Sequence, residues 1–442
     1  MASSLGLYWE RIRTSYWFIP GLIVAICAGF ALALPGIDDR FDTAGALGFV
    51  FTGSSQGARS LLGAVATAVL PVAGTTFTIT IAVLSLTSQQ YGSYLLRNFM
   101  KDTGSQVVLG TFIGTFVYAL LVMRTIRDPD EDKFVPNLGV TGGVALAVLS
   151  VAMLVFFVHR ISTAIQASRI VADVSDELGA VIDRLYPVEI GEGSPAPDPP
   201  WTWPASPAPC EVLATDSGYL QGVDGDTLMR LAVREGRVVE LLYRPGDFVI
   251  AGLPLYRIAG PPPEDALAHR IAAALELGEH PTPPQDVSFP IRQLGEMAVR
   301  ALSTGINDPE TAALALDRLT VALCALIRRE FPSTWRRDDS GRVRVIAPAR
   351  SFEELLALAF DEIRRHARND PAVLCRLLHA LGAIGRCALT ADRRDAVRRQ
   401  IELVRAQAQD APLPGEAMQQ VGAARLRALQ QCGIEVQPPP GG

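Results

Sequence analysis

Lysine is nearly absent from this sequence, which contains only Lys101 and Lys133 among its 40 basic residues. Because no lysine follows Lys133, no later segment can hold a Walker-type phosphate lysine, a Schiff base, or a biotin or lipoyl attachment site. The scarcity of lysine therefore excludes several chemistries from the rest of the chain and suggests none in their place.

Metal-binding and nucleophile patterns are missing as well. The six cysteines contain no C-x-x-C pair, and the five histidines show no H-x-x-x-H or H-E-x-x-H spacing. One G-x-S-x-G match, at residues 53–57, follows no strand pattern and has no histidine nearby, so it does not indicate a nucleophile elbow. We therefore predict no enzyme activity, no catalytic residues, no metal and no cofactor.

Basic charge is also in deficit, since 46 acidic residues outnumber 40 basic ones and the net charge is −6. A nucleic-acid-binding protein would need a basic domain, so we predict no nucleic-acid partner. The scattered cysteines are best interpreted as free thiols in a reducing compartment.

Long apolar runs, in contrast, dominate the first 165 residues, and the mean hydropathy of the chain is +0.24. We predict four transmembrane helices, at about residues 16–34, 60–86, 107–123 and 138–158. None of these runs contains Asp, Glu, Lys, Arg or His, so the usual signature of a proton relay or an ion-coupled pump is missing. Ala31–Ala33 resembles a signal-peptidase site, which leaves open a cleaved signal peptide in place of the first helix.

The second apolar run carries a narrow stripe of hydroxyl groups. At about 100° per residue, Thr76, Thr80 and Thr87 fall within an arc of about 40°, with Ala73 beside it. Lipid solvates hydroxyl groups poorly, so the stripe is expected to face another helix or water. These threonines are therefore candidates either for lining a pore or for packing between helices.

The third run contains Gly110-x-x-x-Gly114, and small residues four apart let two helices approach closely. We expect these glycines to pack against another helix, within one subunit or between subunits. Lys and Arg residues near the ends of the runs number six on the side of the N-terminus and five on the other side. This small excess favours a cytoplasmic location for both termini.

The rest of the chain predicts a cytoplasmic α+β part that follows the transmembrane domain at 1–165. Its expected segments are an exit helix and Pro-rich linker at 166–209, a small β module at 210–260, a helical domain at 264–434 and a tail at 435–442. The turns around Pro245–Asp247 and Ala251–Pro254 are similar to those of biotinyl/lipoyl-like barrel-sandwich modules. Since the carrier lysine is absent, a structural β-barrel-like module is expected.

Two similar helical hairpins are expected within 264–434, separated by a polar break at 336–344. Each contains Asn-Asp-Pro between two amphipathic patterns: Asn307, Asp308 and Pro309 in the first hairpin, and Asn369, Asp370 and Pro371 in the second. Asp at the N-cap followed by Pro is a strong helix start, because Asp accepts an otherwise unpaired N–H and Pro lacks one. These residues are therefore candidates for helix-capping turns.

Several of these stretches resemble the bacterial predicted membrane proteins grouped as domain of unknown function 2254. The stretches that carry the resemblance are Thr78–Ser93, Gln106–Tyr118, Ser217–Gln221, Pro245–Val249 and Ser303–Ala312. The chain departs from the family pattern at Tyr91-Gly92-Ser93, where a Ser-Pro-Arg run is usual, and at Thr304, where Pro is usual. The resemblance implies a multi-pass protein of the bacterial inner membrane with a cytoplasmic part, and it brings no activity and no catalytic residues.

Two functions remain open at this stage. The first is a homo-oligomeric channel or passive transporter with a cytoplasmic regulatory domain, in which the threonine stripe lines a pore. The second is a non-conducting membrane scaffold or sensor, in which the stripe is a packing surface. The expected partners are the lipid bilayer, further copies of the chain, and an unknown cytoplasmic protein or a small ion.

Overall fold

The computed structural model describes residues 17–38, 51–91, 103–127, 134–164, 166–186, 208–281 and 285–434. The chain forms two compact units, Met1–Arg169 and Ile170–Gly442, and each is described by itself. Most of the predicted Pro-rich linker and the predicted tail lie outside the described residues.

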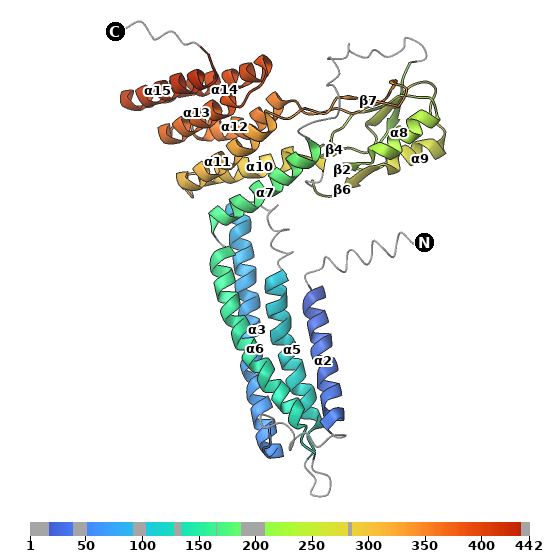
Figure 1. The fold of residues 1–442 in the computed structure, drawn as a ribbon, viewed down its shortest axis with the longest axis vertical. Coiled ribbons are helices and arrows are strands. Elements are labelled where there is room, and N and C mark those ends of the chain that lie inside the picture. The colour runs from blue at the N-terminus through green and yellow to red at the C-terminus, as the bar shows by residue number, and fades with distance from the viewer. Residues whose placement is uncertain are drawn as a thin grey trace. The chain divides into compact units, whose positions relative to one another are not determined.

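The first unit consists of long apolar helices (Figure 1). They are α2 (Phe18–Asp38), α3 (Ser55–Tyr91), α5 (Thr103–Thr125) and α6 (Asn137–Ala164). Each contains a stretch long and apolar enough to cross a membrane, which confirms the prediction of four candidate spans. Such a stretch suits lipid because a helix satisfies its backbone hydrogen bonds internally.

Helix α5 is the most enclosed of the four, with 61% of its most apolar window buried against 22% for each of the others. Its two predicted packing glycines face α2: Gly110 lies against Pro20 and Ile23, and Gly114 lies against Cys27. A Cβ atom on Gly110 would lie 2.9 Å from the Cα atom of Pro20. The glycines thus set how closely α2 and α5 approach within a single chain.

Polar contacts connect α5 to α6. The Tyr118 hydroxyl donates to the Gly139 carbonyl at 2.9 Å, and the Thr115 and Ser150 hydroxyls lie 3.1 Å apart. All of these side chains are buried. Since lipid offers no hydrogen bonds, such contacts between helices satisfy polar groups that would otherwise face hydrocarbon.

The second unit includes most of α7 (Ala167–Leu185) and contains two sheets and a helical layer (Figure 1). One sheet has the order β1-β5-β3-β8-β7 and the other the order β4-β2-β6. The strands are β1 (Cys210–Leu213), β2 (Gly218–Val223), β3 (Val239–Leu241), β4 (Phe248–Val249), β5 (Pro254–Ile258), β6 (Leu275–Gly278), β7 (Trp335–Arg337) and β8 (Val343–Ile346). Two short helices, α8 (Gly225–Arg234) and α9 (Asp265–Ala273), pack with the strands around a core that includes Leu220, Leu228 and Tyr256.

The prediction of a β-barrel-like module is wrong in two respects. Among the described residues the strands form two open sheets and no closed barrel. The module also extends beyond residues 210–260, because β6 pairs with β2, and β8 pairs in parallel with β3. The stretch at 336–344, expected as a polar break, instead supplies parts of the β7–β8 hairpin. Within residues 210–260, β3 pairs only with β5. Its other edge receives its hydrogen-bond partners from β8.

The turns of this module are nevertheless built on glycine as expected. Gly246 and Gly252 have φ angles of +92° and +83°, a region that residues with a Cβ atom rarely adopt. They flank the short strand β4 and reverse the chain on either side of it.

Six helices complete the unit, and each of the two Asn-Asp-Pro turns lies between two consecutive helices of this set. They are α10 (Ser288–Ala301), α11 (Pro309–Leu326), α12 (Phe352–His366), α13 (Pro371–Arg386), α14 (Ala391–Gln409) and α15 (Gly415–Gln431). Asp308 accepts from the Thr311 N–H and hydroxyl, and Asp370 accepts from the N–H groups of Ala372 and Val373. Asn307, with φ +48°, makes the turn that brings Asp308 into position.

We predict that Gly110→Ala destabilises the helical bundle by about 1–3 kcal/mol, because the added methyl group would collide with the backbone of Pro20. The measurement is thermal unfolding of the detergent-purified protein followed by circular dichroism. Gly29→Ala is the matched control, since a Cβ atom there meets nothing within 4 Å. Equal melting temperatures for the two variants would contradict the close contact between α2 and α5.

We also predict that the cap of α11 makes a stability contribution that depends on pH. Hydrogen bonds from the Thr311 hydroxyl and N–H lower the pKa of Asp308. The cap therefore stabilises the fold above the unfolded pKa, near 3.9, and its contribution is lost as the pH falls through the lower folded pKa. Asp308→Ala should cost about 1 kcal/mol at pH 7 and progressively less below about pH 4.

This second prediction is tested by melting curves of wild type and variant between pH 7 and pH 3. The exposed Asp339 provides the control Asp339→Ala. A difference between wild type and Asp308→Ala that stays constant over the whole range would contradict a role for the ionised carboxylate.

Candidate functional site

Helix α3 presents its predicted threonine stripe to the other helices of the same chain. Thr76, Thr80 and Thr87 are only 3%, 8% and 3% exposed. They continue the face of Val69 and Ala73, which belong to the cluster that packs against α5. The Thr80 hydroxyl donates to the Thr76 carbonyl at 2.8 Å, so its proton is used within the helix. In a single chain this stripe occupies packing positions.

The opposite face of α3 carries a second polar stripe, which the sequence analysis missed. At about 100° per residue its positions fall within an arc of about 80°. Every residue in it is small or carries a hydroxyl group, and every one is exposed: Ser60, Ala64, Thr67, Pro71, Gly74, Thr78, Ala82 and Ser85. We call this set the outer stripe. The alternating spacing of three and four could have revealed it, because it matches that of the buried face.

Two features make the outer stripe unsuited to lipid. Pro71 has no N–H, so the usual helix bond to the carbonyl of Thr67 cannot form, and both residues lie on the stripe. The Thr78 hydroxyl donates to the Gly74 carbonyl at 3.0 Å, which leaves its oxygen lone pairs directed away from the helix. Oxygen acceptors without donors are costly in hydrocarbon and favourable next to water or a cation.

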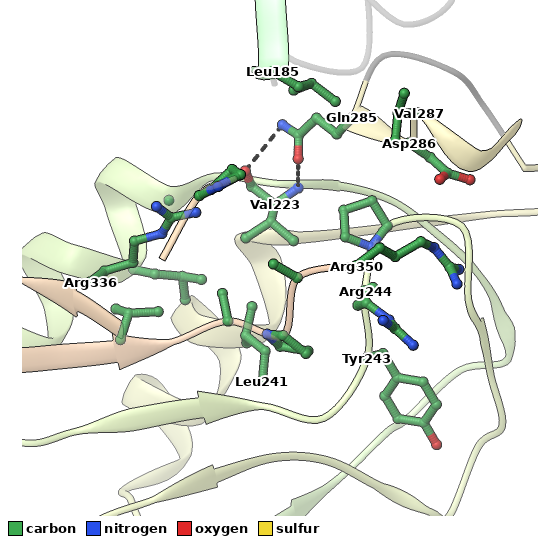
Figure 2. Close-up of a pocket in the computed structure, with 18 of the residues that line it drawn as sticks. Leu185, Val223, Leu241, Tyr243, Arg244, Gln285, Asp286, Val287, Arg336 and Arg350 are labelled. Atoms are coloured by element: carbon green, nitrogen blue, oxygen red, sulfur yellow. Dashed lines mark hydrogen bonds between the residues drawn. The ribbon is translucent and has the colours of Figure 1, made fainter. Parts of the chain in front are cut away.

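The second unit contains a cavity of about 840 Å³ where several loops meet the end of α7. Its apolar lining includes Leu185, Leu228, Met229, Leu241 and Val345. Gln285 closes part of the wall, since its amide accepts from the Val223 N–H and donates to the Val223 carbonyl (Figure 2). A cavity of this size with a mainly apolar lining and a few polar groups is typical of small-molecule sites.

Arginines dominate the charge of this cavity. Arg184, Arg244, Arg336 and Arg350 line it, together with two aspartates, Asp226 and Asp286. Asp286 is buried and already accepts from the Ser288 N–H and from Arg292, at 2.9 Å each. Arg244 and Arg350 form ion pairs with Glu354 and Asp247, so the attraction of this lining for an anionic ligand rests mainly on Arg336.

Tyr186 forms a buried part of the cavity wall. Burial and the nearby Asp286 raise the pKa of Tyr186 to about 12, so its hydroxyl stays protonated at neutral pH. Among the described residues no group of three His, Cys, Asp or Glu side chains could hold a metal ion. The cavity thus has the features of a small-molecule binding site.

The cavity residues could not have been chosen from the sequence. Arg244, Arg336 and Arg350 come from three separate segments that meet because β8 pairs with β3. The one available signal is the alternation of Val343 and Val345 with arginines, which is typical of a strand. Asn307 and Asn369, with their capped turns, do not line the cavity.

Four apolar helices joined to a unit of helices and open sheets define a multi-span membrane protein with a substantial globular part. The chain belongs to the family described as predicted membrane protein (DUF2254), which matches residues 13–383. This match confirms the resemblance seen in the sequence.

The curated relatives carry no functional description. Uncharacterized protein Rv1290c of Mycobacterium tuberculosis and uncharacterized protein Mb1321c of Mycobacterium bovis are each 33% identical to this chain over 439 residues. In both cases the similarity covers 98% of this chain and 84% of the relative. No solved structure matches the chain.

We predict that Thr80→Leu lowers stability by about 1–3 kcal/mol, because a larger side chain must fit into the packed face of α3. The exposed Thr78 provides the control, and Thr78→Leu should leave the melting temperature nearly unchanged. Both variants are compared by thermal unfolding in detergent. A stable Thr80→Leu protein would argue that the buried stripe borders an open space.

Proposed function

We propose that this protein is a homo-oligomeric channel or passive transporter whose pore is lined by the outer stripe of α3. The proposal is based on the polar groups that the outer stripe exposes. They are its hydroxyl groups and the Thr67 carbonyl, which lacks its usual helix hydrogen bond because Pro71 has no N–H. Around a shared axis the small side chains would keep the lumen open, and the oxygen atoms would replace part of an ion's hydration. The lone pairs of these oxygen atoms suit a small cation.

This arrangement revises which threonines would line the pore. A pore between subunits must be built from side chains that a single chain leaves exposed, and Thr76, Thr80 and Thr87 are buried. Thr67, Thr78 and the other members of the outer stripe meet that condition. The predicted spans contain no Asp, Glu, Lys, Arg or His, which is compatible with passive flow rather than ion-coupled pumping.

The proposal includes the location and the role of the globular unit. We infer a protein of the bacterial inner membrane with both termini in the cytoplasm, where the unit Ile170–Gly442 would regulate the pore. The proposal assigns no catalytic activity to the chain. The second candidate is a non-conducting scaffold or sensor, and the packing of Thr76 and Thr80 within one chain is the observation that favours it.

We expect Thr78→Leu to reduce cation flux about tenfold or more, because leucine adds bulk to the lumen and removes an oxygen ligand. The measurement is K⁺ flux into liposomes that contain the purified protein, together with the mass of the same sample in detergent. Ala152→Leu is the matched control, since Ala152 is an exposed small residue of a different helix, α6. A ring of four or more subunits is expected for the wild type.

Two results would contradict the proposed pore. A monomer or dimer that is impermeable to K⁺ would overturn the pore and favour the scaffold. Equal flux through wild type and Thr78→Leu would show that any conduction path lies elsewhere.

A further inference from the structure

The cavity of the second unit contains one arginine whose charge is not balanced by a described neighbour. Arg244 pairs with Glu354 at 3.0 Å and with Asp247 at 3.8 Å, and Arg350 pairs with Asp247 at 3.2 Å. None of the residues that the structure describes forms a hydrogen bond or ion pair with the guanidinium of Arg336. Figure 2 shows Arg336 on one side of the cavity, with Arg244 and Arg350 on the other.

The surroundings of Arg336 make this imbalance significant. The side chain is accessible to solvent, yet neighbouring protein atoms displace enough water to lower the pKa of Arg336. A partly desolvated cation without a counter-ion is unfavourable, and an anion bound beside it would relieve that cost. Its planar guanidinium also matches the geometry of a carboxylate or a phosphate.

The neighbouring walls indicate the rest of the ligand. Val345 lies on β8, the strand next to β7, and Leu241 lies on β3 on the far side of β8. Met229 lines the same cavity from α8. These side chains offer an apolar surface, and the volume of about 840 Å³ is within the range for small organic molecules. An inorganic anion would pair with the arginine and leave this surface bare.

We propose that the cavity binds a small organic anion, with its phosphate or carboxylate on Arg336 and its apolar or aromatic body on the wall formed by Leu241, Val345 and Met229. This binding site goes beyond the proposed pore and does not depend on it. A channel could fail to conduct while the cavity still binds its ligand, and the reverse could also be observed.

Isothermal titration calorimetry on the full-length protein in detergent tests the proposal. The probes are AMP and benzoate, which join an anionic group to an aromatic body, and adenosine and inorganic phosphate, which supply each part alone. We expect saturable binding of AMP or benzoate with a Kd of about 1 mM or lower, and weaker binding of the separate parts. Arg336→Ala should weaken that binding about tenfold or more.

Two further variants test the proposed contact between the anionic group and the guanidinium of Arg336. Arg336→Lys keeps the charge but loses the planar pair of donors, so an intermediate affinity is expected. Arg337→Ala is the matched control, because Arg337 is the next residue of the same strand, does not line the cavity and bonds to the Gly341 carbonyl instead. Circular dichroism checks that each variant is folded, which is expected for changes on an exposed strand.

Either of two results would overturn the proposal. One is the absence of saturable binding for both AMP and benzoate up to about 10 mM. The other is binding that Arg336→Ala and Arg337→Ala affect equally, since that would place the anion away from Arg336.

Discussion

Hydrocarbon provides no hydrogen bonds, and the first unit is arranged around that constraint. Helices satisfy the backbone internally, and polar side chains must find partners on the same helix or on a neighbour. The Tyr118–Gly139 and Thr115–Ser150 contacts satisfy polar groups on α5 and α6, while Gly110 and Gly114 let α2 approach closely. Close packing matters here because the hydrophobic effect does not drive helices together in lipid, so van der Waals contact takes its place.

Helix α3 is the exception, because some of its polar groups have no hydrogen-bond partner on the same helix or on a neighbouring one. The functional proposal is based on these groups. On the buried face of α3 the Thr80 hydroxyl has a hydrogen-bond partner, since it donates to the Thr76 carbonyl within a packed cluster. On the outer stripe some groups lack such a partner, because Pro71 removes a backbone donor and several hydroxyl oxygens face outward. A second subunit or water would satisfy these groups, whereas lipid would not. The polarity of one helix face is therefore the feature on which the proposed assembly rests.

The second unit depends on a different kind of contact, between strands far apart in the chain. The parallel pairing of Val239 with Val345 joins the early β segment to the hairpin at 335–346. That pairing brings Arg336 to a cavity whose apolar wall comes largely from other segments. The cavity, and with it the proposed anion site, exists only because this long-range pair forms. The proposed ligand would bind to this unit and not to the membrane helices.

Periodicity and composition, read from the sequence alone, determined the four candidate spans, the mixed nature of the second unit and the helix starts at Asp308 and Asp370. These features depend on neighbours within a few residues, so local patterns are sufficient to predict them. Only the tertiary structure decided which of two hydroxyl stripes on α3 is buried and whether the strands close into a barrel. It also decided that Arg336 lines a cavity. The physical reason is that both faces of α3 have similar spacing and polarity, and the partner of β3 lies about a hundred residues away in the chain. Such choices are made by packing and pairing between distant segments, which no local pattern contains.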